Sequence, residues 1–330
     1  MRKSLHITST FDEKYKVYLM AMISSAIQSA GDDFELTFHL FGDGISADTT
    51  GTYETFIREK GHAVHWLRDA TAGVEIPLTS YFSRVASARL FLADAIDSSV
   101  DSVVYLDSDV IVCPGAIHAL YETDIGDRAL GVVEDFAFTD VNAMAQNIGI
   151  YDESYRYFNS GVLIINLKKW RSENATQKHV EILAQKGSSF IYVDQDVLNL
   201  CWKDDLHYLP YRFNATSILF AFTQGDILNA PRYDTNEILE AINRPMLLHF
   251  YGFLENRPWK TFCFHPKRKL YVKAAKASPY PFVLENTPWR QSADYTKLYL
   301  LRLKNTRLGV IPFRLFLKCK EYLRQLRGVR

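Results

Sequence analysis

Two aspartates with one residue between them, Asp107 and Asp109, follow the apolar run Val103–Leu106. In extended backbone, residues i and i+2 point to the same side, so the two carboxylates are expected to lie side by side. Paired carboxylates repel each other unless a proton or cation lies between them. Hard divalent cations prefer oxygen ligands, including phosphate oxygens. The pattern therefore indicates a divalent-metal site, and its alternative is a solvated turn that ends a strand.

A single histidine near the end of another apolar run, Met246–Phe250, extends this hypothesis. Imidazole is a ligand for several transition metals, so His249 is a candidate third ligand, although a lone histidine after a strand is usually structural. Two basic residues follow it, Arg257 and Lys260. Either of them is suited to neutralise a leaving phosphate.

The first apolar run, Leu5–Thr8, is followed by Thr10, Asp12 and Tyr15. Nucleosides commonly bind after the first strand of a doubly wound sheet, so Asp12 is a candidate nucleoside contact. The alternative is that Asp12 caps the helix that follows.

Polar residues also stand beside two further predicted elements. Asn159, Ser160 and Gly161 precede the apolar run Val162–Asn166, and glycine there permits a ligand to approach the backbone closely. Asp194 and Gln195 stand at a predicted helix start, where capping is the alternative to a binding role. These residues are candidate ligand contacts.

The elements that position these residues alternate along the chain. Predicted strands are Leu5–Thr8, Leu36–Leu40, Val103–Leu106, Ala129–Val133, Val162–Asn166 and Met246–Phe250. Predicted helices are Tyr15–Ala30, Ser46–Glu59, Val85–Ile96, Pro114–Tyr121 and Gln195–Cys201. This order predicts an α/β fold with a mainly parallel sheet, whose ligands bind beyond the carboxyl ends of the strands. Prolines interrupt the pattern from residue 260 onward, so the catalytic domain is predicted to span residues 1–262 and a C-terminal extension residues 263–330.

Charge is distributed unevenly over the 330 residues. The formal net charge is zero, which gives no general affinity for nucleic acid. Residues 290–330 nevertheless contain eleven Lys or Arg and two acidic residues, a net charge of +9, so residues 1–289 carry −9. Apolar and basic residues interleave at helical spacing in the tail. This pattern predicts a basic amphipathic helix on an anionic membrane surface, and its alternative is packing against the acidic body.

The bulk composition limits the location of the protein. The four cysteines are far apart and lack metal-ligand or redox spacing, which is typical of a reduced cytosolic protein. The N-terminus lacks the apolar segment of a signal peptide, and no apolar run approaches the roughly 20 residues that span a bilayer. We therefore expect a cytoplasmic protein, peripheral on the inner face of the cell membrane.

Four segments together resemble glycosyltransferase family 8, and within it the galactosyltransferases and glucosyltransferases of bacterial lipooligosaccharide and lipopolysaccharide. They are Tyr-Leu-Asp-x-Asp (105–109), Phe-Asn-x-Gly-Val-Leu-x-Ile-Asn (158–166), Asp-Gln-Asp-x-Leu-Asn (194–199) and His-x-x-Gly…Pro-Trp (249–259). The resemblance runs from about residue 4 to residue 262. It implies a GT-A type nucleotide-sugar-binding domain with a mainly parallel mixed sheet, and an enzyme that transfers a hexose from a UDP-sugar with retention of configuration.

The resemblance also implies residue roles. The Mn²⁺ ligands, with Mg²⁺ as the alternative metal, correspond to Asp107, Asp109 and His249. Positions that match substrate contacts are Thr10, Asp12, Arg89, Asp135, Asn159, Ser160, Asp194, Gln195 and Gly252, and the candidate catalytic residues are Gln195 and Asp194. Either Arg257 or Lys260 corresponds to the diphosphate contact. Tyr81 stands where the most similar group has a histidine near donor and acceptor, which leaves the acceptor open.

A saccharide acceptor is expected, the lipid-linked oligosaccharide of a lipopolysaccharide or lipooligosaccharide, and the donor is UDP-galactose or UDP-glucose. Two other functions remain open at this point. One is a non-catalytic nucleotide-sugar or glycan-binding protein of the same fold. The other is a glycoside hydrolase, which is disfavoured because Asp107 and Asp109 are too close in sequence to flank a glycosidic bond.

Overall fold

The computed structural model describes residues 2–69, 71, 84–136, 141–221, 234–251, 257–261, 263 and 265–286. Its strands are β1 (Lys3–Asp12), β2 (Phe34–Asp43), β3 (Ala63–Trp66), β4 (Ser102–Leu106), β5 (Val110–Val112), β6 (Leu130–Glu134), β7 (Phe158–Asn166), β8 (Leu206–Tyr208), β9 (Ala215–Thr216) and β10 (Leu247–His249). Its α-helices are α1 (Lys16–Ala30), α2 (Ala47–Glu59), α3 (Arg84–Ser87), α4 (Leu92–Ala95), α5 (Ala116–Glu122), α6 (Val141–Asn147), α7 (Leu167–Ser172), α8 (Ala175–Lys186), α9 (Val193–Cys201), α11 (Thr235–Asn243) and α12 (Arg268–Lys276).

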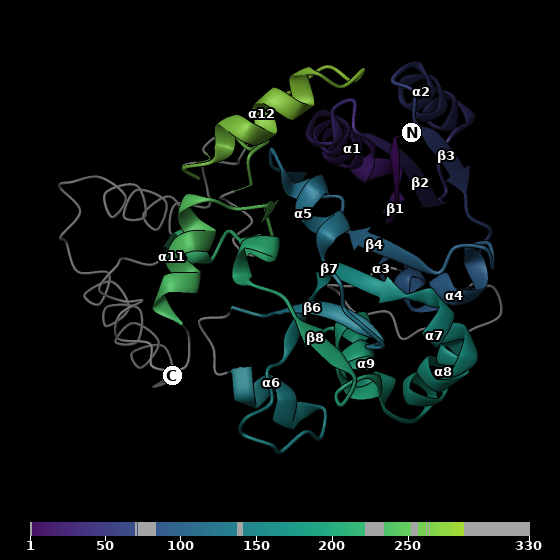
Figure 1. The fold of residues 1–330 in the computed structure, drawn as a ribbon, viewed down its shortest axis with the longest axis vertical. Helices are drawn as coiled ribbons and strands as arrows, with labels where there is room; N and C mark the ends of the chain where they lie inside the picture. Colours follow the sequence, from purple (N-terminus) through teal and green to yellow (C-terminus); the bar gives the residue numbers. More distant parts are fainter. Residues whose placement is uncertain are drawn as a thin grey trace, which may run out of the picture.

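Seven strands form the main sheet, in the order β3-β2-β1-β4-β7-β6-β8 (Figure 1). All of them run parallel except β7, which is antiparallel to both β4 and β6. The predicted mainly parallel mixed sheet is therefore confirmed. A second sheet of three strands, β5-β10-β9, branches off directly after β4.

Both faces of the central strand β4 are buried. Val104 and Leu106 belong to a core shared with α1, α5 and α12, whereas Val103 and Tyr105 belong to a second core shared with α4, α7, α8 and α9. Figure 1 shows α1 and α5 on one side of the sheet and α7 and α8 on the other. The sequence of a strand that is buried on both sides is a continuous run of apolar residues. For this reason β4 could be predicted from the sequence.

The antiparallel direction of β7 sets the geometry of the polar residues. Leu106 at the end of β4 pairs with Val162, so the first residues of β7 lie where β4 ends. Opposite β6, three residues of β7 have no partner, because Val132 pairs with Leu163 and Val133 with Asn159. This bulge frees Ser160–Val162 from the β6 ladder beside the carboxyl edge of the sheet.

Two of the differences between the predicted elements and the structure affect site residues. Val162–Asn166 was expected to form a strand, but β7 begins four residues earlier, at Phe158, because Phe158 and Asn159 pair with Glu134 and Val133 of β6. The helix expected at Val85–Ile96 is divided into α3, a 3-10 turn at Ala88–Phe91, and α4. Arg89 lies in this tighter turn, and its Nε donates to the carbonyl of Ala86.

Residues beyond the predicted domain boundary pack on the catalytic body. Helix α12 lies beside α1 (Figure 1), and Tyr271 of α12 joins the same core as Trp259, with ring centroids 5.4 Å apart. The boundary at residue 262 stays a prediction. In the described part of the chain, no helix is long and apolar enough to cross a membrane.

Candidate active site

Asp107, Asp109 and His249 meet at the carboxyl end of β4. A tight turn after β4, closed by the Val110 N–H donating to the Asp107 carbonyl, leads directly into β5. Strand β10 runs antiparallel to β5 with His249 opposite Val110, which brings the histidine beside the two acids. The His249 Nε2 lies 3.2 Å from Asp109 Oδ1 and 3.7 Å from Asp107 Oδ2. Among the described residues, this is the one group of three metal-ligating side chains whose ligand atoms lie within 4.8 Å of one another.

Gly161 makes room for this cluster. A Cβ at Gly161 would lie 2.2 Å from His249 Cε1 and 2.6 Å from Asp107 Oδ2, closer than non-bonded atoms approach. Its carbonyl also accepts the Asp107 N–H at 2.8 Å. Close approach at this glycine was predicted for a ligand, but in the structure the side chains that approach it are His249 and Asp107.

One oxygen of Asp107 is committed to the protein. Its Oδ1 accepts from the Tyr105 hydroxyl and from Arg89 Nη2, both at 2.9 Å. Since Tyr105 gives its only proton to Asp107, the Thr10 hydroxyl donates to Tyr105, at 3.1 Å. Oδ2 remains directed toward His249, as expected of a carboxylate that supplies one oxygen to a cation.

Arg89 joins Asp107 to a second buried carboxylate, Asp194. Its Nη1 donates to the carbonyl of Ser160 at 2.7 Å and to the Ser160 hydroxyl at 3.1 Å, and its Nε lies 3.0 Å from Asp194 Oδ2. The guanidinium also stacks over the Tyr105 ring, 4.4 Å from its centroid. Burial opposes the charge on Arg89, yet Asp107 and Asp194 outweigh burial and raise its pKa. Arg89 is therefore held in place by contacts to five protein residues, namely Ala86, Tyr105, Asp107, Ser160 and Asp194.

Asp194 is completely buried at the start of α9, and one of its oxygens is unsatisfied. Oδ2 accepts from the Ser160 hydroxyl at 3.0 Å in addition to Arg89. No donor among the described residues reaches Oδ1. Burial raises the pKa of Asp194, and the charge of Arg89 opposes this rise. A buried carboxylate oxygen without a partner is costly, so it is a candidate acceptor for a ligand hydroxyl.

The predicted sugar-contacting residues form one hydrogen-bonded group. Gln195 Oε1 accepts from Asn159 Nδ2 at 3.1 Å and from the Ser160 N–H at 3.0 Å. Gln195 Nε2 donates to Asp135 Oδ2 at 3.3 Å, and Tyr251 donates its hydroxyl to Asp135 Oδ1 at 2.6 Å. Burial raises the pKa of Asp135 in spite of these two donors.

The cluster of acids changes the ionisation of its own members. Burial alone would lower the pKa of His249, but Asp109 and Asp107 outweigh it and raise the pKa. Burial likewise opposes ionisation of Asp109, yet His249 and Arg257 together hold its pKa below the usual range. The raised pKa of His249 reflects the carboxylates around it, whereas the lowered pKa of Asp109 reflects its positively charged neighbours.

A cavity of about 200 Å³ leads away from the acids. It reaches from Asp107 and Asp109 past Arg89 to Asp12 and Tyr15 at the end of β1. Asp12 Oδ1 accepts from the N–H groups of Lys14 and Tyr15, so the capping alternative for Asp12 is observed. Capping occupies one carboxylate oxygen, and Asp12 still lines the cavity.

The two basic candidates after His249 differ in their surroundings. Lys260 forms an ion pair with Glu285. Arg257 lies over Trp259, 5.5 Å from the ring centroid, and its charge contributes to lowering the pKa of Asp109. Its Nε is buried with no partner among the described residues. The geometry therefore favours Arg257 as the basic group of the site. Tyr81, Gly252 and the tail 290–330 lie outside the described residues.

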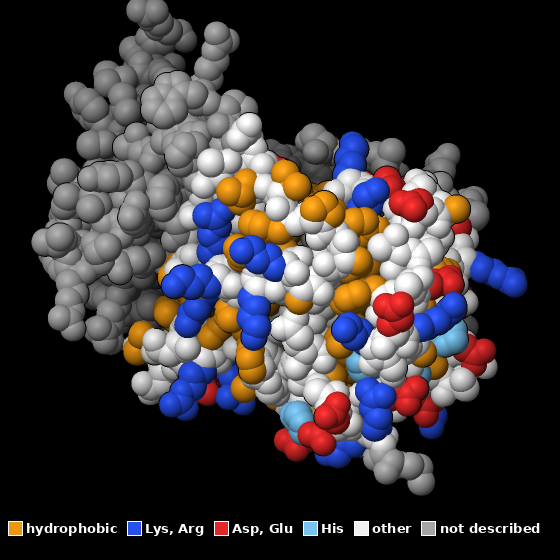
Figure 2. All heavy atoms as spheres, turned by 90° about the horizontal axis from the view of Figure 1, so that it is seen from above, with side chains coloured by type: hydrophobic (Ala, Val, Ile, Leu, Met, Phe, Trp, Pro, Cys, Tyr) orange, Lys and Arg blue, Asp and Glu red, His pale blue; other side chains and the backbone are white. Residues whose placement is uncertain are grey.

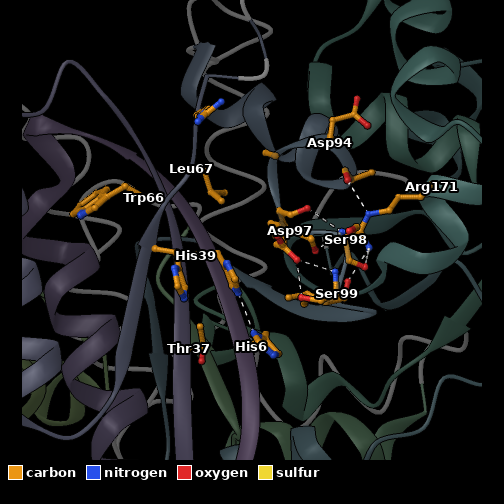
Figure 3. Close-up of a pocket in the computed structure, with 16 residues that line it drawn as sticks. His6, Thr37, His39, Trp66, Leu67, Asp94, Asp97, Ser98, Ser99 and Arg171 are labelled. Carbon is orange, nitrogen blue, oxygen red and sulfur yellow. Dashed lines mark hydrogen bonds between the residues drawn. The ribbon is translucent and has the colours of Figure 1, made fainter.

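A second, larger cavity of about 760 Å³ is lined by residues of β1, β2 and β3 and by residues 93–100 (Figure 3). His6 and His39 point toward each other there, with Nδ1 and Nε2 3.0 Å apart, and His65 stacks on His39 at 5.5 Å. Burial and the neighbouring histidines lower the pKa of His39 to about 4. Arg171, which also lines this cavity, donates to backbone carbonyls such as those of Ala93 and Val100. These histidines do not converge as a metal site, so the smaller cavity beside the acids is the candidate active site.

The sequence model of the family named "Glycosyl transferase family 8" matches residues 6–263. The chain belongs to glycosyltransferase family 8. The matched range includes every residue of the cluster described above. The predicted family and the predicted enzyme class, a glycosyltransferase, are confirmed.

Individual relatives agree with this membership. The chain is 28% identical to general stress protein A of Bacillus subtilis over 82% of its own length and 93% of that protein. It is 24% identical to a lipopolysaccharide 1,2-glucosyltransferase of Escherichia coli, over 88% of this chain and 82% of that one. Among solved structures, galactosyltransferase LgtC in complex with donor and acceptor sugar analogues superposes with a TM-score of 0.71 at 27% identity, covering 88% of this chain and all of LgtC. This family 8 enzyme thus has the GT-A fold that its sequence predicted.

Proposed function

We propose that this family 8 enzyme transfers galactose or glucose from a UDP-sugar to the oligosaccharide of a lipopolysaccharide or lipooligosaccharide, with retention of configuration. The observation that carries the proposal is the convergence of Asp107, Asp109 and His249 at one end of the cavity that begins at Asp12. The names of the relatives support the substrate classes. One is a lipopolysaccharide glucosyltransferase, and another is a galactosyltransferase described with donor and acceptor sugar analogues.

The residues present fit a divalent metal. Two carboxylates and one imidazole converge within 4.8 Å, and the excess negative charge raises the pKa of His249. A mixed oxygen and nitrogen set suits Mn²⁺ better than Mg²⁺, which prefers oxygen ligands alone. Asp107 Oδ2, Asp109 and His249 Nε2 would hold the metal. Bound there, it would act as a Lewis acid on the diphosphate of the donor.

The donor would lie along the cavity. Asp12 and Thr10 stand at its nucleoside end, and Tyr15 offers an aromatic face there. Arg257 is the proposed diphosphate contact, because Lys260 is already paired with Glu285. A fixed positive charge beside the leaving diphosphate stabilises the charge that develops as the sugar–phosphate bond breaks.

The hexose would reach the buried polar group beyond the metal cluster. Asp194 Oδ1 lacks a partner among the described residues, which suits it to accept from a sugar hydroxyl. Gln195 follows it directly and is held by its hydrogen bond to Asp135 Oδ2. Arg89, Ser160, Asn159 and Asp135 hold these two groups in place through the contacts described above.

Retention requires either a covalent intermediate or attack from the face that the diphosphate leaves. Gln195 is a neutral amide and a poor nucleophile, and the unpartnered Oδ1 of Asp194 is assigned to a sugar hydroxyl. We therefore favour same-face attack. The bond from C1 to the diphosphate breaks, the acceptor hydroxyl bonds to C1, and its proton passes to the leaving phosphate oxygen. A glycosyl adduct on Asp194, trapped with a slow donor analogue, would contradict this mechanism.

A panel of UDP-sugars, assayed with Mn²⁺ and without acceptor, tests the proposal. We expect slow release of UDP from UDP-galactose or UDP-glucose, faster than from the other donors, and none in the presence of a chelator. Binding of UDP without any turnover would instead favour a non-catalytic nucleotide-sugar-binding protein. Turnover of glycosides without UDP-sugar would favour a hydrolase.

The acceptor is proposed to be lipid-linked, and the enzyme to lie on the inner face of the cell membrane through residues 290–330. Exposed Lys269, Lys273 and Lys276 form a stripe on α12, which has no acidic residue, and Val283 nearby is 68% exposed. In Figure 2, Lys and Arg side chains lie among hydrophobic ones on the side next to the grey residues. This surface supports attraction to anionic lipid. If a chain that ends near residue 290 bound anionic vesicles as tightly as the full chain, the role of the tail would be refuted.

A further inference from the structure

Asn214 lies between the metal cluster and the sugar-contacting group, and no motif pointed to it. It ends the 3-10 turn Tyr211–Asn214, directly before β9, which runs parallel to β10 with Ala215 opposite Leu248. In this register Thr216 lies opposite His249, and the side chain of Asn214, which is 2% exposed and two residues before Thr216, reaches His249. Both ends of its side-chain amide are used. Oδ1 lies 3.0 Å from His249 Nδ1, and Nδ2 lies 2.8 Å from Asn159 Oδ1.

Two backbone N–H groups fix the direction of every hydrogen bond in this group. The Gly161 N–H points to one end of the Asn159 side chain, at 3.0 Å, so that end must be the carbonyl oxygen. The partner that Asn214 offers to the same oxygen must then be its NH₂ group. The Ser160 N–H fixes Gln195 Oε1 as an acceptor in the same way, at 3.0 Å.

This direction determines the state of His249. With its NH₂ group facing Asn159, Asn214 presents its carbonyl oxygen to His249 Nδ1, which therefore carries the proton. In the neutral imidazole, Nε2 is then the unprotonated nitrogen, and it faces Asp107 and Asp109. A histidine that ligates a metal requires this tautomer, and a partner on its other nitrogen usually enforces it.

The same amide supports the opposite side of the site. The Asn214 NH₂ group and the Gly161 N–H both donate to Asn159 Oδ1, so the NH₂ group of Asn159 is directed to Gln195. Gln195 in turn directs its NH₂ group to Asp135. One continuous chain of donors therefore runs from His249 through Asn214 and Asn159 to Gln195 and Asp135.

We propose that Asn214 is a positioning residue that serves both halves of the reaction site. Through its carbonyl it holds His249 Nε2 ready for the metal, and through its NH₂ it holds Asn159 and Gln195 in the orientation that meets the hexose. The inference rests on the proposed function, since it assumes a metal at His249 and a sugar at Gln195.

Two substitutions separate the two roles. Asn214→Asp keeps an acceptor for His249 Nδ1 but offers a carboxylate oxygen, in place of a donor, to Asn159 Oδ1. Asn214→Ala removes both partners. Asn166→Ala is the matched control, because Asn166 also uses both ends of its amide, to Lys169 N at 2.9 Å and the Arg128 carbonyl at 3.3 Å, at the far end of β7.

The experiment measures two quantities on the full chain at neutral pH. The first is Mn²⁺ affinity in the presence of UDP, by electron paramagnetic resonance. The second is kcat for hydrolysis of the UDP-hexose that the wild type prefers. We expect Asn214→Ala to lose roughly 10- to 100-fold in Mn²⁺ affinity, the usual effect of removing the partner of a metal-bound histidine. Asn214→Asp is expected to stay within about 3-fold of the wild-type affinity but to lose at least about 10-fold in kcat, and the control to change neither by more than about 2-fold.

Equal effects of the two Asn214 substitutions on Mn²⁺ affinity, or wild-type kcat in Asn214→Asp, would overturn the inference while leaving the proposed function standing. A wild type that binds no Mn²⁺ with UDP would overturn the proposed function and this inference with it. If Asn214→Ala does not fold, Asn214→Ser takes its place, since its hydroxyl is too short to reach both partners and the same losses are expected.

Discussion

Two fully buried histidines, His249 and His179, lie in regions that shift their pKa in opposite directions. His179 of α8 donates from Nδ1 to the Leu90 carbonyl at 2.8 Å and accepts at Nε2 from Trp202 Nε1 at 3.0 Å, packed against Trp170. Burial lowers its pKa to about 4. Around His249, two carboxylates outweigh burial and raise the pKa.

The difference shows how a structural histidine is distinguished from a candidate ligand. Both nitrogens of His179 are satisfied by neutral partners, so the region is complete without a cation. Only Nδ1 of His249 has a neutral partner, and Nε2 faces an excess of negative charge. Burial is the same in both cases, so the unbalanced charge of the neighbours is what marks a site.

The largest expected effect comes from removing that charge. Asp109→Asn should lower transfer in Mn²⁺ by about 10³-fold, about 4 kcal/mol of transition-state stabilisation, because an amide is a poor metal ligand. Initial rates of UDP release measure the loss. Asp152→Asn, in an exposed turn where Asp152 caps Ser154, is the control and should keep the wild-type rate. Full activity in Asp109→Asn would show that the negative charge beside His249 is not needed for transfer, and that it does not mark a metal site as we infer from the comparison with His179.

Filling the space at Gly161 should come next. Gly161→Ala places a methyl group against His249 and Asp107, so Mn²⁺ affinity should fall by about 100-fold, the upper range for disturbed ligand geometry. Calorimetric titration with Mn²⁺ measures the change. Gly51→Ala in α2 meets nothing within 4 Å and should leave affinity unchanged while raising stability by about 0.5–1 kcal/mol. Unchanged affinity in Gly161→Ala would mean that the cluster is looser than its distances indicate.

The two basic residues after β10 give a matched pair. Arg257→Gln should lower kcat for donor hydrolysis roughly 10- to 100-fold, the cost of one lost charged hydrogen bond. Lys260→Gln should stay within about 3-fold, because Lys260 is already paired with Glu285, and a partly exposed ion pair of this kind contributes little. A larger loss of kcat in Lys260→Gln than in Arg257→Gln would identify Lys260 as the diphosphate contact.

The last prediction concerns stability, not activity, and belongs to His179. Its pKa of about 4 in the folded chain lies below the ordinary histidine pKa of about 6.5, so between these two pH values only the unfolded chain binds a proton at His179. Its contribution to the free energy of unfolding is therefore complete above about pH 6.5 and is lost as the pH falls toward 4, by up to about 3 kcal/mol. Denaturant titrations from pH 4 to 7 should show a shallower decline in His179→Gln than in the wild type. An equally steep decline would assign the acid sensitivity to other buried histidines such as His265, whose pKa burial lowers to about 3.

The sequence allowed the metal cluster to be predicted because each member adjoins an apolar strand. Asp107 and Asp109 follow β4, and His249 ends β10. The direction of β7 was not predictable, since a doubly buried strand has the same apolar pattern in parallel and antiparallel pairing. That direction is what brings Asn159 and Ser160 to the end of β4.

Other parts of the site depended on contacts between residues far apart in sequence. Asn214 has no local signal, because its partners lie 35 and 55 residues away and an asparagine in a short turn is ordinary. The choice between Arg257 and Lys260 likewise needed Glu285, which is 25 residues beyond Lys260. Spacing along the chain identified the candidate ligands, and tertiary contacts were needed to orient them.

The central claim is that the acids hold a metal which in turn holds the donor diphosphate. The most direct measurement is calorimetric binding of UDP to the full chain, with Mn²⁺ and with a chelator, in the wild type and in Asp109→Asn. We predict that Mn²⁺ strengthens UDP binding to the wild type at least about 10-fold, or about 1.4 kcal/mol, and does not strengthen binding to Asp109→Asn. Equal affinity of the wild type for UDP with and without Mn²⁺ would contradict the claim.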